Sequence, residues 1–549
     1  MKKLKTIGIK LSYRILLLVL LLSACTNGFE KINTNPNGVD DMKIGLENKL
    51  QFPQENLFPS DANMYQYWRS LHIDIFAGYC TTPHNFGNNH NGNYRLREDF
   101  NHGPFENYFL NVLPYTNRYI PICKEVEFYD YAAVTLIVQV MGMLQVVDTY
   151  GPTNYRSIKE HAATLYYDSD RDIYTDLIDE LRQSIQWLED FLESNPSTER
   201  LAGLAKFDRL CGGSHTRWLR LANTLCLRIA MHMVKAEPAR AKELSEKAVN
   251  NKYGVFIDAS DDILLSGGNP IRTVDVIYGD SRMNASIESI LKGYGDPRME
   301  KWFTRSGRIV NNEGEMTLKA DSTCVGIRQG LLIETKSPLL YLNFSSSTYQ
   351  SYDPRPVMHA AEAWFLRAEG ALRGWQMGQS AQYCYEQGVR VALSSYGISH
   401  TDEYLSGANA PDNGTKAADY IDYHDSFYNT PGINNISVTW HENDTKEQKL
   451  QRIITQKWLA IYPDSFEAWT EFRRTGYPRL FPVVYNLSGG LIDTETQIRR
   501  LPFTRKEYNT NGDEVKKAIR YLKGADTGGT RLWWDIAESG NFPSENEKK

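Results

Sequence analysis

Apolar residues recur every three or four positions along several stretches of the chain, which is the spacing of one face of a helix. In residues 172–194 the recurring positions are Ile173, Leu177, Leu181, Ile185, Leu188 and Leu192. Further helices are predicted over residues 214–238, 239–250, 359–375, 380–397, 447–462 and 465–476. These segments follow one another two by two, so the pattern predicts about four helix pairs.

One predicted helix differs from the others because it is apolar nearly all round. It covers residues 131–151 and ends at Gly151-Pro152. Such a helix is expected in the interior of a protein. Gln139 and Gln145 interrupt the apolar surface, and the run is judged too short to span a membrane.

The predicted helix pairs are separated by long polar segments rich in Gly and Asn. One helix, over residues 359–375, keeps a small face, made of Ala360, Ala361, Ala363, Ala368 and Ala371. Small residues let helices approach closely, as in tetratricopeptide-type packing. The irregular segments cover residues 81–103, 260–282, 304–355, 396–445 and 481–531. The expected fold is mostly α, with helix pairs, long irregular loops and a few short strands in one body.

The start of the chain has the order of parts found in an export signal. Residues 1–14 carry five positive charges, residues 15–22 are continuously apolar, and Ser23 and Ala24 lead to Cys25. The run "LSAC" also matches the bacterial lipobox, in which the cysteine becomes the lipidated first residue. We therefore expect a signal peptide over 1–24, a lipidated tether over 25–45 and a ligand-binding domain over 46–549. The alternative is a buried N-terminal helix that contains a cysteine.

The charge of the chain argues against a nucleic-acid partner. The 61 Lys and Arg residues face 67 Asp and Glu residues, a net charge of −6. Loss of residues 1–24 would make the chain still more acidic. An acidic protein repels phosphate backbones.

The common catalytic and cofactor motifs are missing. The sequence has no HExxH, GxSxG, P-loop or dinucleotide-binding GxGxxG. His84, His90 and His102 fit no standard metal spacing, so we predict neither a metal nor a cofactor. The six cysteines after Cys25 contain no CxxC pair, and buried free thiols are favoured over disulfides.

Candidate ligand contacts are found in the irregular segments. The loop 72–103 combines amides with aromatic rings, which suit the hydroxyl edges and apolar faces of sugars. Its candidates are His84, Asn85, Phe86, Asn88 and Tyr94. The alternative is that Asn and Gly only shape turns there.

Two other segments supply the remaining candidates. Residues 336–354 contribute Tyr341, Phe344 and Tyr349, although their alternation also fits an ordinary strand. Trp302 is the last candidate, with packing in the core as the alternative reading.

Several motifs resemble one known family in the same order along nearly the whole chain. They are "FEKINTNPN", "GDPRMEKWF", "PVMHAAEAWFLRAEGALRGW", "ITQKWLAIYPDSFEAWTEFRRTGYPRL", "LPFTRKEYNTN" and "TRLWWD". The sequence resembles SusD/RagB-type nutrient-binding lipoproteins of Bacteroidetes. The resemblance implies a single SusD-like body with tetratricopeptide-like helix pairs and no enzymatic activity. It also implies a SusC-like TonB-dependent transporter as partner, over which the protein sits at the outer membrane.

The resemblance implies capture of oligosaccharides, host glycans among them, for delivery to the transporter. The resemblance further implies a lipid-anchored location at the outer membrane, facing the cell surface, although only Glu30 follows Cys25 where relatives often carry an acidic cluster. Two alternatives stay open. One is a RagB-like protein that captures peptides, and the other is a surface glycoside hydrolase, which would need two convergent carboxylates.

Overall fold

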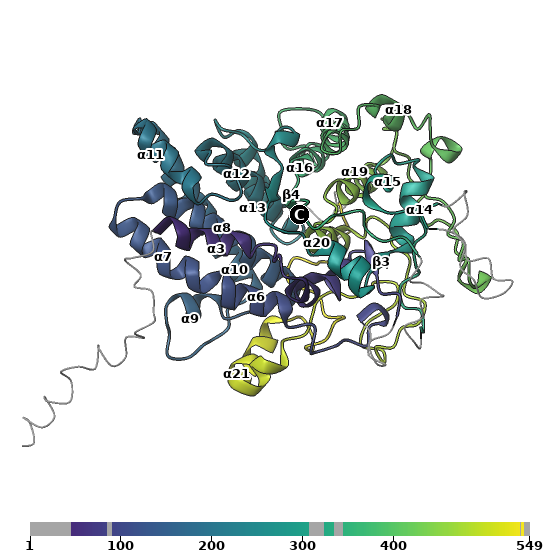
Figure 1. Cartoon of the computed structure of the whole chain (residues 1–549), viewed down its shortest axis with the longest axis horizontal. Helices are drawn as coiled ribbons and strands as arrows, with labels where there is room; N and C mark the ends of the chain where they lie inside the picture. The colour runs from purple at the N-terminus through teal and green to yellow at the C-terminus, as the bar shows by residue number, and fades with distance from the viewer. Residues whose placement is uncertain (1–45, 85–90, 307–322, 334–343, 538–539, 543–549) are drawn as a thin grey trace, which may run out of the picture. The chain divides into compact units, whose positions relative to one another are not determined.

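The predicted helix pairs are all present in the computed structural model of the chain (Figure 1). The structure describes residues 46–84, 91–306, 323–333, 344–537 and 540–542. Residues 50–549 form one compact unit, to which the following description applies. The pairs are α8 (Tyr129–Tyr150) with α10 (Asp170–Glu193), α12 (His215–His232) with α13 (Pro238–Val249), α16 (Ala361–Leu372) with α17 (Ala381–Ser394), and α19 (Lys446–Ala460) with α20 (Ser465–Thr475).

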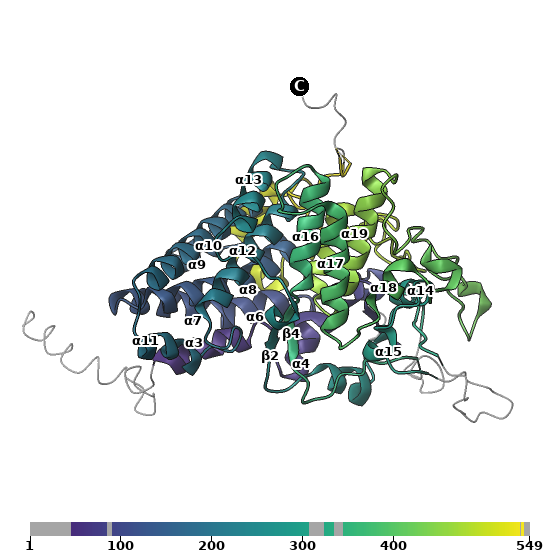
Figure 2. The ribbon, with the colours of Figure 1, turned by 90° about the horizontal axis from the view of Figure 1, so that it is seen from above.

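The pairs pack against one another in sequence. Helix α10 contacts both α8 and α12, and α16 contacts α12, α17 and α19. Figure 2 shows α10, α12, α16, α17 and α19 following one another side by side. This arrangement confirms the predicted tetratricopeptide-like packing.

Shorter elements complete the described part of the chain. The remaining helices are α3 (Leu46–Glu55), α4 (Ala62–Tyr65), α5 (Ile73–Phe76), α6 (Gly103–Asn111), α7 (Leu113–Glu125), α9 (Tyr155–Lys159), α11 (Thr198–Gly203), α14 (Ala285–Gly293), α15 (Met299–Trp302), α18 (Thr401–Ser406) and α21 (Arg505–Ala518). The strands are β1 (Cys80–Thr81), β2 (Ile263–Leu265), β3 (Arg282–Met283) and β4 (Arg355–Met358). They form two antiparallel two-stranded sheets, β1 with β3 and β2 with β4. Helix α21 lies inside a segment that the sequence predicted to be irregular.

Helix α8 is the apolar helix predicted over residues 131–151. Contrary to the sequence-based expectation, its 22 residues are long and apolar enough to cross a membrane. However, 94% of its most apolar window is buried inside the protein, which is typical of a core helix. Gln139 is buried there because its amide accepts from Thr116 Oγ1 at 2.7 Å and donates to the Tyr155 hydroxyl at 2.9 Å.

Local sequence explains where the paired helices begin and how closely they pack. Thr445 and Gln448 form a capping box at the start of α19, which satisfies otherwise unpaired backbone N–H groups. In α16 the predicted small face is real, since Ala361, Ala363 and Ala368 are fully buried. Helix α17 approaches this helix so closely that a Cβ on Gly388 would lie 2.8 Å from the ring of Phe365.

The six cysteines of the described part of the chain are buried and free. They act as small apolar groups, so the expectation of free thiols is confirmed for these residues.

A buried ammonium joins three of the paired helices. Lys457 of α19 is fully buried, and its Nζ lies 2.6 Å from Glu467 and 3.2 Å from Glu471, both on α20. The same Nζ lies 3.4 Å from Glu362 of α16. Burial alone would lower the pKa of Lys457, but these carboxylates raise it above its ordinary value. The charge is therefore fixed, and the three helices are held around it.

Removing this ammonium should destabilise the protein strongly. We expect Lys457→Met to lower the free energy of unfolding by about 3–5 kcal/mol, because it leaves buried carboxylates without their cation. Urea unfolding followed by circular dichroism measures the change. The matched control is Lys516→Met, whose side chain is 72% exposed and which should change stability by less than about 0.5 kcal/mol. Equal stability of the two variants would contradict the role given to Lys457.

Candidate functional site

Short extended segments from distant parts of the chain meet beside the helices. Strands β1 and β3 pair antiparallel, with Cys80 opposite Met283. Met283 then donates its N–H to Ser345 O at 2.8 Å and accepts from Ile327 N at 2.9 Å. Phe303 forms a further antiparallel bridge with Ser347. We call this region the platform and define it as residues 79–84, 275–284, 302–306, 323–333 and 344–349.

The platform brings together four of the residues predicted as ligand contacts: His84, Trp302, Phe344 and Tyr349. Tyr94 lies outside it, in the wall of a cavity of about 290 Å³ between loops. Asn85, Phe86, Asn88 and Tyr341 lie outside the described residues. The structure therefore places these four residues in one region, and their contact with a ligand stays a prediction.

Trp302 is 1% exposed, which agrees with the alternative interpretation that it packs in the core. Its ring centroid lies 4.7 Å from that of Tyr462 and 5.5 Å from that of Tyr396. Tyr349 is half-buried and reaches the same group, because its hydroxyl bonds to Tyr396. The ring faces of Trp302 are thus occupied by protein in this structure.

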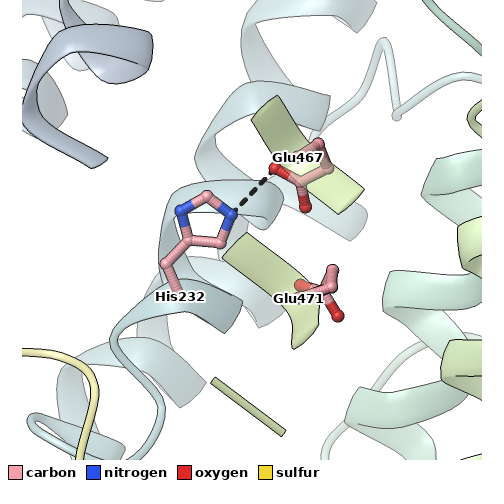
Figure 3. A group of neighbouring side chains, drawn as sticks. All are labelled: His232, Glu467 and Glu471. Atoms are coloured by element: carbon pink, nitrogen blue, oxygen red, sulfur yellow. Dashed lines mark hydrogen bonds and ion pairs between the residues drawn. The ribbon is translucent and has the colours of Figure 1, made fainter. Parts of the chain in front are cut away.

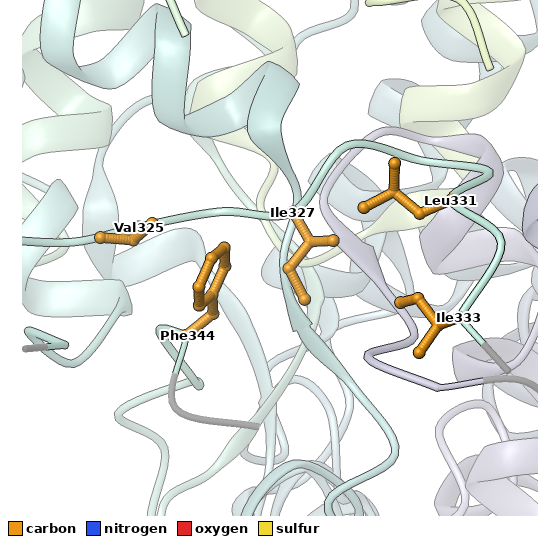
Figure 4. Close-up of a cluster of buried hydrophobic side chains, with 5 residues drawn as sticks. All are labelled: Val325, Ile327, Leu331, Ile333 and Phe344. Carbon is orange, nitrogen blue, oxygen red and sulfur yellow. The ribbon is translucent and has the colours of Figure 1, made fainter. Parts of the chain in front are cut away.

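His84 and Phe344 are also turned inward. His84 Nε2 lies 2.8 Å from Asp280 Oδ1, and both residues are buried. Phe344 stacks on His424, with ring centroids 5.4 Å apart and planes 8° from parallel. It belongs to a buried cluster with Val325, Ile327, Leu331 and Ile333 (Figure 4). These buried side chains form an apolar core for the platform.

An aromatic hairpin that the sequence patterns did not predict covers this cluster. Residues 420–430, "YIDYHDSFYNT", are closed at their base by two backbone bonds between Tyr420 and Thr430, of 2.8 and 3.0 Å. Tyr423 and Tyr428 pack on the buried cluster of Phe344. Phe427, by contrast, is 73% exposed. The density of aromatic residues in this stretch is a signal that could have found the site.

The tip of the hairpin has a fixed shape. Asp422 Oδ1 accepts the backbone N–H groups of His424 and Asp425, at 2.8 and 3.1 Å. Asp425 Oδ1 accepts the N–H of Phe427 at 2.9 Å. Aspartates that bond their own backbone in this way define tight turns. The Tyr428 ring packs edge-on against Phe427 at 5.4 Å, so the exposed Phe427 ring is presented from a supported loop.

The carboxyl group of Asp275, in the platform, has an unusual pKa. Asp275 is buried, and its Oδ2 accepts the backbone N–H of Ser347 at 3.3 Å. Burial raises the pKa of Asp275 to about 7, although Arg282 opposes this shift. Its carboxyl therefore links two platform segments while releasing its proton only near neutral pH.

A second group of buried side chains has the chemistry of a metal site. Ligand atoms of His232, Glu467 and Glu471 all lie within 4.8 Å of one another (Figure 3). However, the Lys457 ammonium already lies against both carboxylates. Burial alone would lower the pKa of His232, but Glu467 and Asp148 raise it to about 9. The ammonium already pairs with both carboxylates, and Glu467 also pairs with His232, so this group acts as an ion network.

Comparison with known proteins places this architecture in a family. The family model for SusD-like proteins, described as SusD and RagB outer membrane lipoprotein, matches residues 31–535. The chain belongs to the SusD-like family. This confirms the resemblance and accounts for the mostly helical, tetratricopeptide-like fold.

Solved structures of other SusD homologues are similar over most of their length. A chitin-binding SusD homologue from Flavobacterium johnsoniae is 36% identical, with a TM-score of 0.82 over 90% of this chain and 100% of that one. A homologue from Bacteroides vulgatus is 29% identical, with a TM-score of 0.82 over 90% and 98% of the two chains. A SusD-like protein from Bacteroides thetaiotaomicron is 30% identical, with a TM-score of 0.80 over 91% and 100%. No match is found among curated proteins.

The acidity of Asp275 gives a test of the platform in this SusD-like protein. The folded chain keeps the Asp275 proton up to about pH 7, whereas an ordinary aspartate releases it near 3.8. Between pH 3.8 and about 7 the folded state holds the Asp275 proton and the unfolded state does not. The free energy of unfolding therefore falls as the pH rises through this range. We expect the stability of Asp275→Asn relative to the wild type to increase between pH 4.5 and pH 8, by on the order of 2–4 kcal/mol.

Thermal unfolding of both proteins across this pH range measures the difference. The control is Asp513→Asn, since the Asp513 side chain is 91% exposed and should give no pH-dependent gain. A stability difference for Asp275→Asn that does not change with pH would contradict the assigned pKa shift.

Proposed function

We propose that this SusD-like protein is a lipid-anchored, non-catalytic protein that captures oligosaccharides at the cell surface. It delivers them to a SusC-like TonB-dependent transporter in the outer membrane. Cys25 is the proposed lipidation site, with residues 1–24 as signal peptide and 25–45 as tether.

The observation that carries this proposal is the similarity to the chitin-binding SusD homologue. The identity of 36% over 90% of this chain supports a related class of ligand. Chitin is a polymer of β-1,4-linked N-acetylglucosamine. Its oligosaccharides are therefore the first ligands to test.

The aromatic hairpin supplies surface chemistry that suits such a ligand. Sugar rings have apolar CH faces, which pack on aromatic rings, and Phe427 offers an exposed ring. Tyr428 lies beside it, and its hydroxyl bonds to Tyr485. Because the turns at Asp422 and Asp425 hold the hairpin, little conformational freedom would be lost on binding. We place the ligand on the hairpin and the adjoining edge of the platform.

The arrangement of the platform carboxyls supports capture without catalysis. A glycosidase needs two carboxyls that face the substrate, one of them with a raised pKa. Asp275 has a raised pKa, but its side chain is buried and bonded to Ser347. Asp280 is bonded to His84 and to Gln66. Both carboxyls hold the platform together.

Binding should depend on the exposed ring of the hairpin. We expect calorimetry of residues 26–549 with chitotetraose to show binding without any hydrolysis product. Phe427→Ala should weaken it about fivefold, because one aromatic contact contributes about 1 kcal/mol. The control is Tyr129→Ala, which removes a 41% exposed ring on α8 and should leave affinity unchanged.

The same titration should include maltooligosaccharides, mucin and N-glycan fragments, and peptides. Binding to peptides with no binding to any glycan would replace the proposed function by peptide capture. Release of shorter sugars would instead indicate a glycoside hydrolase.

A further inference from the structure

A cavity of about 290 Å³ lies between four loops, apart from the platform. The loops are residues 94–98, 487–492, 502–505 and 526–528. Backbone bonds fix them to the body, as Leu487 N donates to Asn93 O at 2.8 Å and Arg499 N donates to Gly528 O at 2.7 Å. Gly528 packs closely here, since a Cβ there would lie 2.7 Å from Ile492 Cδ1. The volume is suited to one small group, near the lower limit of ligand pockets.

The walls of the cavity are largely apolar. Leu96, Ile492, Pro502 and Phe503 line it. Leu491 also lines it and is 61% exposed, which is unusual for a large aliphatic side chain. An apolar group entering the cavity would remove this leucine from water, which is favourable.

The polar groups around the cavity are already used by the protein. Asp526 bonds to Arg500, to the backbone N–H of Phe503 at 3.1 Å and to the Tyr508 hydroxyl at 2.7 Å. Ser488 Oγ donates to Ile492 O at 3.2 Å and accepts from Ile492 N at 3.1 Å. A saccharide, whose hydroxyls need several directed partners, would find few of them here.

Three charged side chains of the lining, Glu98, Arg505 and Asp526, are already paired. Arg505 lies 3.4 Å from Glu98, and Asp526 is paired with Arg500. A short free peptide carries a charged amine and a charged carboxylate, and a site built to capture it would offer unpaired charges. A rim with paired charges instead suits the uncharged backbone of an internal segment of a longer chain.

We infer that this cavity is an anchor pocket for one bulky apolar side chain on a loop of a partner protein. A deep apolar pocket with a polar rim, in which one large side chain is buried, is typical of the energetic centre of an interface. Arg505 of α21 lines the cavity, and Tyr508 of the same helix bonds to the lining residue Asp526; Tyr and Arg are enriched at such centres. The inference rests on the proposed function only in naming the transporter as the partner whose loops would carry the side chain.

The test uses capped pentapeptides as probes of one loop side chain. Peptides of the form acetyl-Gly-Ser-X-Ser-Gly-amide, with X as Leu, Phe, Ala or Asp, are titrated against residues 26–549 by saturation-transfer NMR. This chain retains the compact unit formed by residues 50–549. We expect the Leu or Phe peptide to bind at least tenfold more tightly than the Ala peptide, and the Asp peptide not to bind.

Two variants locate the binding. Leu491→Asp places a charge on the cavity wall, and Thr527→Trp fills the cavity, so each should abolish peptide binding. Since Leu491 is largely exposed, its variant should fold even if Thr527→Trp does not. The control is Val126→Asp, at a 48% exposed apolar position that does not line the cavity, and it should bind peptide as the wild type does.

Three results would overturn the inference. They are equal binding of all four peptides or of none, tighter binding of the uncapped peptides, and competition by the methyl glycoside of N-acetylglucosamine. Chitotetraose binding is measured separately on the same variants. Its absence would overturn the proposed function without affecting the result for the pocket.

Discussion

The buried charge of Lys457 is the constraint on which the helical body depends. An ammonium inside a protein must be surrounded by acceptors, and here they come from two other helices, as Glu362 on α16 and Glu467 and Glu471 on α20. Glu467 in turn lies 3.0 Å from His232 of α12. The network therefore holds four helices in one relative arrangement, whereas apolar packing alone tolerates alternatives more readily.

This arrangement positions the platform through the residue next to Lys457. Trp458 Nε1 donates to Ala77 O at 2.9 Å, and the Tyr79 hydroxyl donates to Trp458 O. Ala77 and Tyr79 lead directly into β1, which pairs with β3. The short strands of the platform thus start from a rigid helical support. The irregular segments carry the candidate site, as is common where loops are positioned by a scaffold.

The sequence predicted the paired helices well because their periodicity is a local property. For example, the helix expected over 465–476 is α20 (Ser465–Thr475), and the apolar run over 131–151 is α8. Helix α21 was missed because only Val515 and Ala518 of its residues are buried, which leaves almost no apolar face to detect.

The candidate site could be predicted only in part. His84, Trp302, Phe344 and Tyr349 were found as residue types, and they do share the platform. Their burial depends on partners far along the chain, such as Tyr462 for Trp302, which no local pattern reveals. The hairpin at Phe427 was missed for the opposite reason. The Phe427 ring is exposed, and the turns of the hairpin are made by aspartates that resemble those of any polar loop.

Hydrogen–deuterium exchange of the chain with and without chitotetraose tests the central claim most directly. The account predicts slower exchange in residues 420–430 and the adjoining platform, with no change in residues 94–98 and 487–492. Protection of the loops around Leu491, with an unchanged hairpin, would contradict it.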